Sequence, residues 1–364
     1  MAEQRIKGFL FILFMALSTF FGCTLILLPS LFIIFPFSYI GYRSVCDWVA
    51  RTWYCVSLFC LEILFKIKIV ITGDEIPTSC MSIITSNHRT RLDWVFIWCL
   101  LVRYNMLEHH KIVLKNDIKM LPGVGWGLQQ FCYIFLKRRW EDDESHIKKA
   151  VNYFRGHNYP VHFLLFPEGT DLTPTNITRS HQYAEQNNLE KYNFVLHPRV
   201  RGLHAMYEQF NQENSTKKIQ KLYDITVGYK GAIPQNETNI LKGNLPTAVY
   251  FHVAGYSPKD LPSDMDGLAK WCNERWKFKE EILEEFYTKQ TPFPGKALRS
   301  PDVHNLILFN ATIWLAIVVA GLWLVATSWM FRWYLVFAML FYFVVSKKGG
   351  LDNLEMWYHF SGSK

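Results

Sequence analysis

The chain has 364 residues, of which 50% are hydrophobic, 16% aromatic and 19% charged, and its formal net charge is +8. A sequence this apolar can offset the entropy lost on ordering, which excludes a disordered or collagen-like chain. Because soluble domains average about 25% charged residues, the low charge content indicates that part of the chain lies in lipid. Anionic lipid headgroups and phosphorylated small molecules explain the surplus of Lys and Arg, and no nucleic-acid partner is expected.

The N-terminal segment is predicted to lie in the membrane. Residues 8–42 contain no charged side chain, and one helix of that length would span roughly 50 Å, well beyond a hydrocarbon core of about 30 Å. Pro29 and Pro36 are candidate breaks. The sequence therefore predicts a membrane helix over residues 8–28, followed by a second embedded or re-entrant stretch over residues 31–42.

The central part of the chain has the character of a globular domain, without repeats or low-complexity segments. Short β-rich runs alternate with longer segments of helical periodicity, which indicates an α/β fold. The predicted strands cover residues 81–86, 111–114, 162–166, 224–229 and 248–253. One amphipathic helix is predicted over residues 267–287, where Trp271, Arg275, Phe278 and Ile282 recur at steps of three to four.

A second hydrophobic region covers residues 305–346 and contains a single charged side chain, Arg332. Two helices over residues 306–324 and 326–345 would form a hairpin, in which Arg332 must reach the membrane surface or find a partner. One tilted helix followed by an interfacial segment fits equally well. The sequence thus divides into membrane-embedded residues 1–42, a globular domain over 43–303, membrane-embedded residues 304–346 and a polar tail over 347–364.

Eight cysteines are scattered through the chain, several of them within apolar runs. They form no CxxC pair and show no spacing typical of metal ligands. This pattern predicts buried apolar thiols, with neither a disulfide framework nor a metal site.

The first candidate catalytic residues are His88 and Asp93, which lie between a strand-like run and an apolar helix-like run. On one continuous helix, five residues subtend about 500°, so the two side chains would lie about 140° apart. They can pair only if His88 lies on the turn before the helix, which Asn87 and Thr90 could hold as turn or cap residues. Asp93 would then fix the tautomer of His88 and leave its other nitrogen as a general base. On this pattern alone, a capping histidine with a helix salt bridge is the commoner interpretation.

The second candidate region follows the predicted strand over residues 162–166. The strand ends in the sequence Pro-Glu-Gly-Thr at residues 167–170. This places a carboxylate (Glu168), a flexible backbone (Gly169) and a hydroxyl (Thr170) at the carboxyl end of a strand, where α/β sheets bind ligands.

A further strand-like run over residues 132–139 ends in three adjacent cations, Lys137, Arg138 and Arg139. An arginine guanidinium is well suited to bind a phosphate with two parallel hydrogen bonds. A solvated charge run is the alternative interpretation, and it is the one adopted for Arg139.

In their order and spacing, these blocks resemble the glycerolipid acyltransferases of the lysophosphatidate acyltransferase type. That family carries an NHxxxxD block, a strand ending in arginine, an FPEGT block and a proline block. The matching positions here are residues 87–93, the strand ending at Arg138, residues 166–170, and residues 195–199 with Pro198. Within the family, the strings NHRTRLDW, FPEGTDLT and KYNFVLHPR are most similar to the lysocardiolipin acyltransferases.

The resemblance covers residues 43–287 and departs from the family pattern at one position. The arginine strand of the family usually opens with glycine, and Cys132 stands there in this chain. The resemblance implies a membrane-associated α/β domain, with a mixed sheet flanked by helices and hydrophobic helices at both ends.

The resemblance also implies an activity, in which a fatty acyl group passes from acyl-CoA to the free glycerol hydroxyl of lysocardiolipin or a related anionic lysophospholipid. Lysophosphatidylinositol and lysophosphatidylglycerol are the related acceptors. His88, oriented by Asp93, would take the hydroxyl proton as that oxygen attacks the thioester. A neutral histidine base predicts that activity falls below about pH 6.5. Acyl-CoA is a substrate here, and no cofactor is expected.

The resemblance implies that Arg138 holds the phosphate of the acceptor, with Lys137 beside it. Glu168 and Thr170 would shape the acceptor site or bind its polar groups, and backbone amides near Gly169 would stabilise the oxyanion. Asn87 and Pro198 complete the set of expected substrate-binding residues.

The family suggests a multi-pass protein of the endoplasmic reticulum membrane, including its contacts with mitochondria, with the active site at the cytosolic face. One alternative within the class is a 1-acylglycerol-3-phosphate acyltransferase of de novo glycerolipid synthesis. A non-catalytic lipid-binding scaffold and a hydrolase that uses water in place of the acceptor are the alternatives from other classes.

Overall fold

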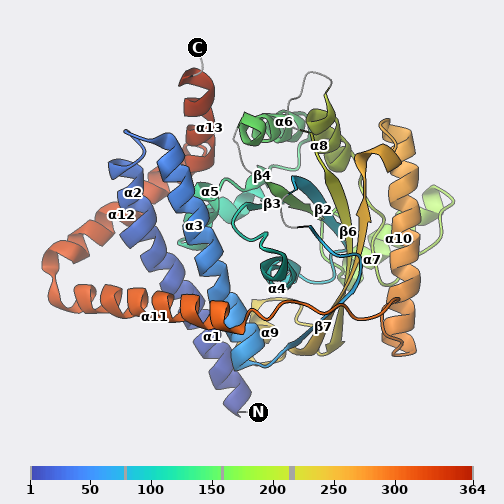
Figure 1. The fold of residues 1–364 in the computed structure, drawn as a ribbon, viewed down its shortest axis with the longest axis horizontal. Helices are drawn as coiled ribbons and strands as arrows, with labels where there is room; N and C mark the ends of the chain where they lie inside the picture. The colour runs from blue at the N-terminus through green and yellow to red at the C-terminus, as the bar shows by residue number, and fades with distance from the viewer. Residues whose placement is uncertain (1, 78–79, 157–159, 213–217, 363–364) are drawn as a thin grey trace.

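The computed structural model describes residues 2–77, 80–156, 160–212 and 218–362. A seven-stranded sheet in the order β1-β7-β6-β2-β5-β3-β4 has helices on both faces, and long apolar helices gather on one side of it (Figure 1). Neighbouring strands are parallel, except that β6 and β7 are antiparallel. The expected mixed α/β sheet is confirmed. The strands are β1 (Lys68–Gly73), β2 (Ser82–Ser86), β3 (His110–Lys115), β4 (Ile134–Leu136), β5 (His162–Leu165), β6 (Lys221–Gly231) and β7 (Pro246–Tyr256).

The helices of the domain around the sheet are α4 (Asp93–Leu101), α5 (Val124–Gln130), α6 (Trp140–Gly156), α7 (Pro174–Gln186), α8 (Arg201–Asn211), α9 (Glu237–Leu241) and α10 (Met265–Thr288). The remaining helices are α1 (Ala2–Phe21), α2 (Leu28–Ile33), α3 (Tyr39–Leu58), α11 (His304–Thr327), α12 (Trp329–Lys347) and α13 (Leu351–Gly362). Figure 1 shows α10 on one face of the sheet and α3, α4 and the apolar helices on the other.

The strand register places the chemistry-bearing loops together. Ser82 at the start of β2 pairs with His162 of β5 on one side and with Lys221 of β6 on the other. Because β2 and β5 are parallel, their carboxyl ends meet at the same edge of the sheet, and the loops that follow them leave side by side. The five predicted β-rich runs are confirmed as β2, β3, β5, β6 and β7, whereas β1 was not predicted.

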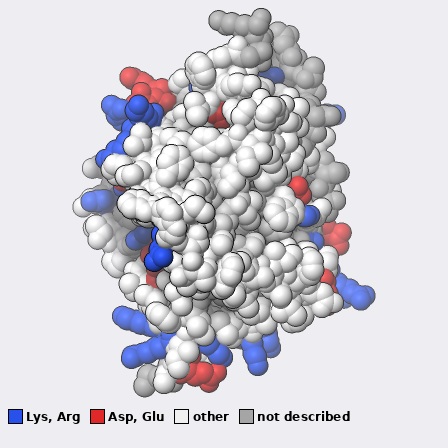
Figure 2. All heavy atoms as spheres, turned by 90° about the vertical axis from the view of Figure 1, so that its left-hand side faces the viewer, with Lys and Arg blue, Asp and Glu red and all other residues white. Residues whose placement is uncertain are grey.

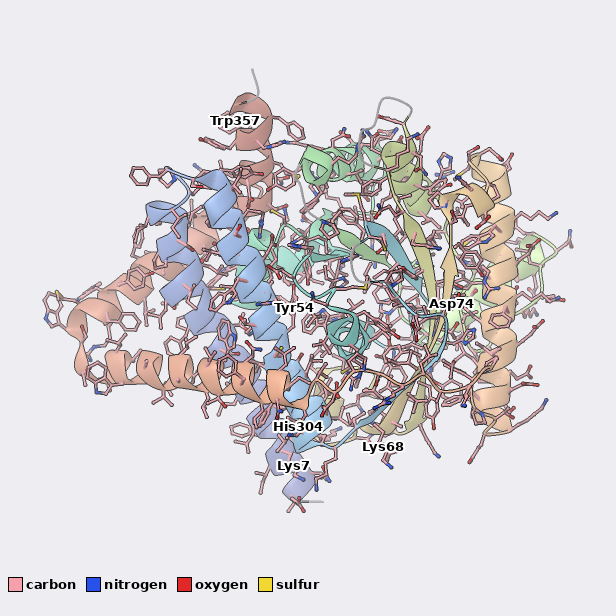
Figure 3. All side chains as sticks on the ribbon, in the orientation of Figure 1. Lys7, Tyr54, Lys68, Asp74, His304 and Trp357 are labelled. Atoms are coloured by element: carbon pink, nitrogen blue, oxygen red, sulfur yellow. The ribbon has the colours of Figure 1, made fainter. Side chains whose placement is uncertain are left out.

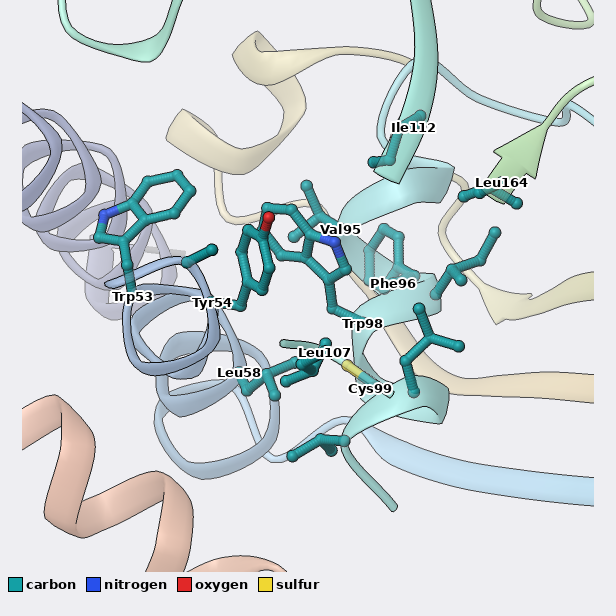
Figure 4. Close-up of a cluster of buried hydrophobic side chains, with 14 of the residues drawn as sticks. Trp53, Tyr54, Leu58, Val95, Phe96, Trp98, Cys99, Leu107, Ile112 and Leu164 are labelled. Atoms are coloured by element: carbon teal, nitrogen blue, oxygen red, sulfur yellow. The ribbon is translucent and has the colours of Figure 1, made fainter. Parts of the chain in front are cut away.

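Helix α4 packs in the core on one face of the sheet. Its sequence is apolar around the whole circumference, as expected of a helix buried on all sides. Trp98 of α4 lies against Tyr54 and Trp53 of α3, with ring centroids 4.1 Å and 5.9 Å away (Figure 4). This packing fixes the first turn of α4, and with it Asp93, against the sheet.

The amphipathic helix predicted over residues 267–287 is present as α10, but its buried face is only partly the predicted one. Of the predicted stripe, Ile282 is buried, whereas Trp271, Arg275 and Phe278 are half-buried. An ion pair accounts for the observed buried face, because the buried Lys279 pairs with Asp224 of β6 at 2.8 Å. The buried face consists of Leu268, Cys272, Trp276, Lys279, Ile282, Leu283 and Phe286.

The N-terminal apolar segment differs from its predicted form. The chain is helical from Ala2 to Ile33 without interruption, and it includes a π-helical segment, Gly22–Leu27, directly before Pro29. The wider π-helical turn accommodates the proline ring that would clash in a regular α-helix, so Pro29 does not end the helix. The helix ends at the turn that contains Pro36. The second embedded stretch, predicted over residues 31–42, therefore consists of the end of this helix, the turn and the start of α3.

The C-terminal hydrophobic region forms two helices, which agrees with the hairpin interpretation. Helices α11 and α12 meet at Ser328, whose Oγ accepts a hydrogen bond from the backbone N–H of Phe331 at 3.2 Å. Arg332 is exposed in the first turn of α12. By length and composition, three helices of the described chain could cross a membrane, with mean hydropathies of 2.4, 2.2 and 1.5: Ala2–Ile33, His304–Thr327 and Trp329–Lys347. The prediction of a membrane protein is confirmed.

The side of the molecule that carries these helices presents a broad uncharged surface, with most Lys and Arg side chains near its margin (Figure 2). Many large hydrophobic side chains of α11 and α12 are exposed there. In Figure 3, Lys7 of α1 and Trp357 of α13 mark opposite ends of this helical side. All eight cysteines lie in described residues and are free and buried, as predicted.

The segment interpreted as a polar tail contains helix α13, which packs on the domain. Its Asp352 accepts a hydrogen bond from Lys119 Nζ at 2.7 Å, and its Glu355 pairs with Arg43 at 3.1 Å. All four of these charged side chains are buried. Because an unpaired buried charge is strongly unfavourable, the carboxylates of α13 stabilise these two cations, of which Arg43 also pairs with the buried Asp47 at 3.4 Å. The predicted boundary between residues 42 and 43 falls inside α3, whose Arg43 belongs to this network.

Candidate active site

His88 and Asp93 form a hydrogen-bonded pair at the carboxyl end of β2. His88 lies two residues beyond the strand, Asp93 is the first residue of α4, and His88 Nδ1 is 2.9 Å from Asp93 Oδ2. An ionised carboxylate can only accept, so Nδ1 carries the proton of this contact, and in the neutral ring Nε2 has a free lone pair. The turn geometry that the five-residue spacing requires is therefore present.

The Asp93 carboxylate is fully buried and receives four hydrogen bonds. Oδ2 accepts from His88 Nδ1 and from the backbone N–H of Thr90 at 3.0 Å. Oδ1 accepts from Thr90 Oγ1 at 3.1 Å and from the phenol of Tyr229, which projects from β6. Sequence reasoning missed Tyr229, because it lies 136 positions beyond Asp93 inside an ordinary strand pattern.

The surroundings of His88 favour its protonated form. Burial lowers the pKa of the imidazole, but the hydrogen bond and negative charge of Asp93, with Glu168 and Asp171 nearby, outweigh burial and raise the pKa above 6.5. The ring stacks on Phe166 with centroids 4.3 Å apart, and the side chain remains 17% exposed. A partly exposed, oriented imidazole can exchange a proton with a bound substrate.

Glu168 faces the protein interior. Its Oε1 accepts from the backbone N–H of His88 and from Trp276 Nε1, both at 3.1 Å, and its Oε2 accepts from the backbone N–H of Leu196 at 3.1 Å. Burial raises the pKa of Glu168 to about 7, although these donors and the charge of His88 lower it in part. The carboxylate thus connects the His88 turn, helix α10 and the 195–199 block. This placement agrees with a group that shapes the site through its protein contacts, and direct contact with the acceptor stays a prediction.

The loop after Glu168 is shaped by its own contacts. Gly169 has φ +72°, a conformation that favours glycine, and its N–H donates to the Phe166 carbonyl at 2.9 Å. That amide is therefore already paired within the loop, and stabilisation of the oxyanion by other backbone amides near Gly169 stays a prediction. Thr170 Oγ1 accepts from Asn176 Nδ2 at 3.1 Å, so Asn176 is a second contact in this region that the sequence did not indicate.

Arg138 lies beside the same loop. Its guanidinium is exposed and donates to the Gly169 carbonyl at 3.2 Å. The two neighbouring cations are exposed and associate with Asp142, Lys137 at 3.9 Å and Arg139 at 2.7 Å. The structure therefore distinguishes Arg138 from its neighbours as the cation that contacts the FPEGT loop.

The backbone explains the departure from the family pattern at Cys132. Cys132 has φ +54° and Arg138 has φ +64°, so left-handed residues stand on both sides of β4. Glycine is the residue best suited to such a position, which accounts for the family preference. Here the Cys132 thiol is buried, donates to Glu355 at 3.3 Å and accepts from Arg43 at 3.1 Å. The cysteine therefore contacts the buried ion pair between Arg43 and Glu355 of α13.

The last two predicted residues, Asn87 and Pro198, lie among protein contacts near the site. Asn87 is buried and forms two hydrogen bonds with the backbone of Val227 on β6, at 3.1 Å and 2.8 Å. Pro198 is half-buried in the loop that contacts Glu168. His197 beside it stacks on Tyr192 and bonds Ser180 at 2.9 Å. Within the residues that the structure describes, no group of three or more His, Cys, Asp or Glu side chains is arranged to hold a metal ion.

Comparisons with known proteins identify the relatives of this chain. An acyltransferase family model matches residues 68–230, and a model of the acyltransferase C-terminus matches residues 239–314. The chain is 37% identical to lysocardiolipin acyltransferase 1 of Mus musculus, over 96% of this chain and 94% of that protein. It is 31% identical to lysophosphatidylinositol acyltransferase 10 of Caenorhabditis elegans, over 86% of this chain and 83% of that protein.

The fold also matches a solved structure, the 1-acyl-sn-glycerophosphate acyltransferase PlsC of Thermotoga maritima. That match covers 78% of this chain and 98% of that chain, with a TM-score of 0.50 and 16% sequence identity. At this identity the match shows a shared fold. The family models and the relatives of nearly full length show more: the chain belongs to the glycerolipid acyltransferase family.

Proposed function

We propose that this acyltransferase transfers a fatty acyl group from acyl-CoA to the free glycerol hydroxyl of an anionic lysophospholipid, and that lysocardiolipin is its principal acceptor. The observation that carries the proposal is the His88–Asp93 pair, with Asp93 saturated by donors and His88 Nε2 directed away from it. Lysophosphatidylinositol and lysophosphatidylglycerol are further acceptors.

His88 is the general base of the proposed reaction. Its Nε2 takes the hydroxyl proton while the hydroxyl oxygen bonds to the thioester carbonyl carbon. The carbon–sulfur bond then breaks, and the leaving CoA sulfur takes the proton from the imidazolium. Asp93 stabilises the imidazolium between these two transfers. Direct transfer of this kind needs no serine nucleophile and no cofactor.

Arg138 binds the phosphate of the acceptor in this scheme. The guanidinium and the His88 ring both contact the loop after β5, Arg138 at Gly169 and His88 at Phe166. One short loop therefore holds the phosphate-binding group and the base in a fixed relation. Lys137 adds positive charge at the same strand end, and Thr170 and Pro198 line the adjoining loops.

The acceptor preference rests on the relatives, whose names refer to lysocardiolipin and lysophosphatidylinositol. A plant relative that is 30% identical over 68% of this chain is named a probable 1-acyl-sn-glycerol-3-phosphate acyltransferase, which keeps lysophosphatidate as the alternative acceptor. We place the enzyme in the endoplasmic reticulum membrane, including its contacts with mitochondria, with the active site at the cytosolic face where acyl-CoA is available.

The test is an acceptor panel with microsomes that contain the full chain. Radiolabelled oleoyl-CoA is offered with lysocardiolipin, lysophosphatidylinositol, lysophosphatidylglycerol or lysophosphatidate, and the labelled products are separated. We expect the first three acceptors to exceed lysophosphatidate, and His88→Ala to abolish transfer. The matched control is His252→Ala, which removes a histidine on β7 that bonds Thr72 at 3.0 Å, and it should remain active.

The other outcomes select the other functions. A preference for lysophosphatidate would indicate de novo glycerolipid synthesis, and release of CoA without any acceptor would indicate a hydrolase. If His88→Ala retains more than a few per cent of the wild-type rate, His88 is not the base. If no acceptor gives histidine-dependent transfer, the protein is a lipid-binding scaffold.

A further inference from the structure

The two oxygens of Asp93 are held from different parts of the fold. The donors from His88 and Thr90 all come from the turn directly before α4. The phenol of Tyr229 comes from β6, the strand next to β2, and donates to Oδ1. The carboxylate is therefore fixed both by its own turn and by the sheet.

Tyr229 itself is held firmly. It is 1% exposed, and its ring meets Phe96 of α4 edge-on with centroids 5.1 Å apart. Its backbone N–H donates to the Tyr287 hydroxyl at 3.1 Å, which joins β6 to α10 at this point. A phenol that is buried this way has few alternative positions, so its O–H is a fixed donor directed at Asp93.

We propose that Tyr229 is a positioning residue of the acyl-transfer site, which orients the Asp93 carboxylate and moderates how strongly that carboxylate holds a proton on His88. The proposal depends on the His88–Asp93 mechanism proposed above. The donor at Oδ1 draws negative charge away from Oδ2, the oxygen that faces His88. Without this donor, Oδ2 carries more negative charge, so the imidazolium becomes more stable and the neutral base is formed only at higher pH.

The other charged groups near the pair keep their contacts when the phenol is removed. Glu168 binds the backbone N–H of His88, Asp171 bonds Gln235, and the Arg89 guanidinium lies 6.0 Å from the centroid of the Tyr287 ring. The Tyr287 hydroxyl accepts its hydrogen bond from the backbone N–H of residue 229, so this bond is kept when the side chain at 229 is changed. A shift in pH dependence after Tyr229→Phe would therefore come from the lost phenol donor.

The experiment measures kcat and both KM values of the purified full-length enzyme in lipid–detergent micelles between pH 5.5 and 9. For Tyr229→Phe we expect kcat at pH 7 to fall about three- to tenfold, with the KM values for acyl-CoA and acceptor unchanged, because the phenol is buried and touches no substrate. We also expect the midpoint of the acidic limb to move upward by about 0.5–1 pH unit.

The matched control is Tyr153→Phe, which removes another buried phenol that donates to a carboxylate, Glu355, at 2.6 Å. This pair belongs to the α13 network, so the variant should lose stability and keep the wild-type pH midpoint. A second probe places 3-fluorotyrosine at position 229. The fluorinated phenol keeps the shape of the ring and is a stronger donor, so the midpoint should move downward.

Three results would overturn the proposal. The first is a wild-type kcat together with a wild-type midpoint of the pH profile in Tyr229→Phe. The second is a loss of activity in this variant that appears only in KM. The third is a midpoint in the fluorotyrosine enzyme that does not move in the direction opposite to that of Tyr229→Phe. Because the fluorinated side chain keeps the ring and the hydroxyl of tyrosine, it provides the answer even if Tyr229→Phe does not fold. Failure of the His–Asp mechanism would appear separately, as activity retained in His88→Ala.

Discussion

Glu168→Gln tests whether the buried carboxylate of the FPEGT block faces substrate or protein. The carboxylate accepts three N–H donors, from His88, Trp276 and Leu196. A glutamine has one carbonyl oxygen, so its amide nitrogen must face at least one of these donors. Leaving a buried donor unsatisfied costs about 1–3 kcal/mol, and we expect a loss of about 2–3 kcal/mol at pH 5.

The loss should depend on pH. Burial raises the pKa of Glu168 from an ordinary 4.5 to about 7, and at about 1.4 kcal/mol per unit this corresponds to about 3 kcal/mol. The folded state keeps the proton of the Glu168 carboxyl group to higher pH than the unfolded state does. This contribution to the free energy of unfolding is therefore fully present below pH 4.5 and is lost as the pH rises through 7. Glutamine does not titrate, so the stability difference between the two proteins should shrink to nearly zero above about pH 7.5.

The assay is thermal unfolding of both proteins in detergent at pH 5, 6, 7 and 8, followed by acyl transfer at each pH. We expect kcat of Glu168→Gln to fall at least tenfold, because the amide nitrogen repels one of the N–H donors that join the His88 turn, α10 and the 195–199 block. The matched control is Glu280→Gln, since Glu280 also accepts three N–H donors, from Asn193, Phe194 and Val195, at 2.6–3.0 Å. That variant should lose stability and keep kcat within a few-fold.

Two outcomes would refute this reasoning about Glu168. A stability difference that does not change with pH would show that the carboxyl group is not titrating in a buried site. A variant with wild-type kcat and a raised acceptor KM would show that Glu168 faces the acceptor, as the sequence suggested.

The remaining predictions concern the base, the phosphate-binding group and the C-terminal helix. Because Asp93 raises the pKa of His88 above 6.5, kcat/KM should fall as the pH drops through a midpoint above 6.5, and a midpoint below it in the pH–rate profile would contradict this. Arg138→Ala should raise the acceptor KM with a smaller change in kcat, and an unchanged KM would count against phosphate binding. Glu355→Gln breaks a buried pair with Arg43 and should destabilise the protein by about 3 kcal/mol, seen as a lower melting temperature.

The contacts of helix α13 connect the C-terminus to the candidate site. Glu355 accepts hydrogen bonds from Arg43, Cys132 and Tyr153, and Cys132 lies just before β4, whose far end carries Arg138. The C-terminal helix therefore supports the strand that positions the proposed phosphate-binding group. Removing α13 would leave Arg43 and Lys119 without these carboxylates, so truncation should destabilise the domain as a whole.

The sequence by itself determined the features that depend on local pattern. Hydrophobic length predicted the membrane helices, alternating runs predicted five strands, and the five-residue spacing required His88 to lie on a turn before the helix of Asp93. The order of the motif blocks indicated the family. Each of these follows from residues close together in the chain, where period, spacing and turn chemistry act directly.

Only the tertiary structure decided how the site is held. Tyr229 reaches Asp93, Trp276 reaches Glu168 and Glu355 reaches Arg43 across 136, 108 and 312 positions of sequence. No local pattern marks these side chains, because each occupies an ordinary strand or helix position. Their partners are buried charged groups, and a buried carboxylate must find donors wherever the fold brings them. The sequence therefore indicated which groups are candidates for the chemistry, and the packing of the sheet against α4, α10 and α13 determined which groups hold them in place.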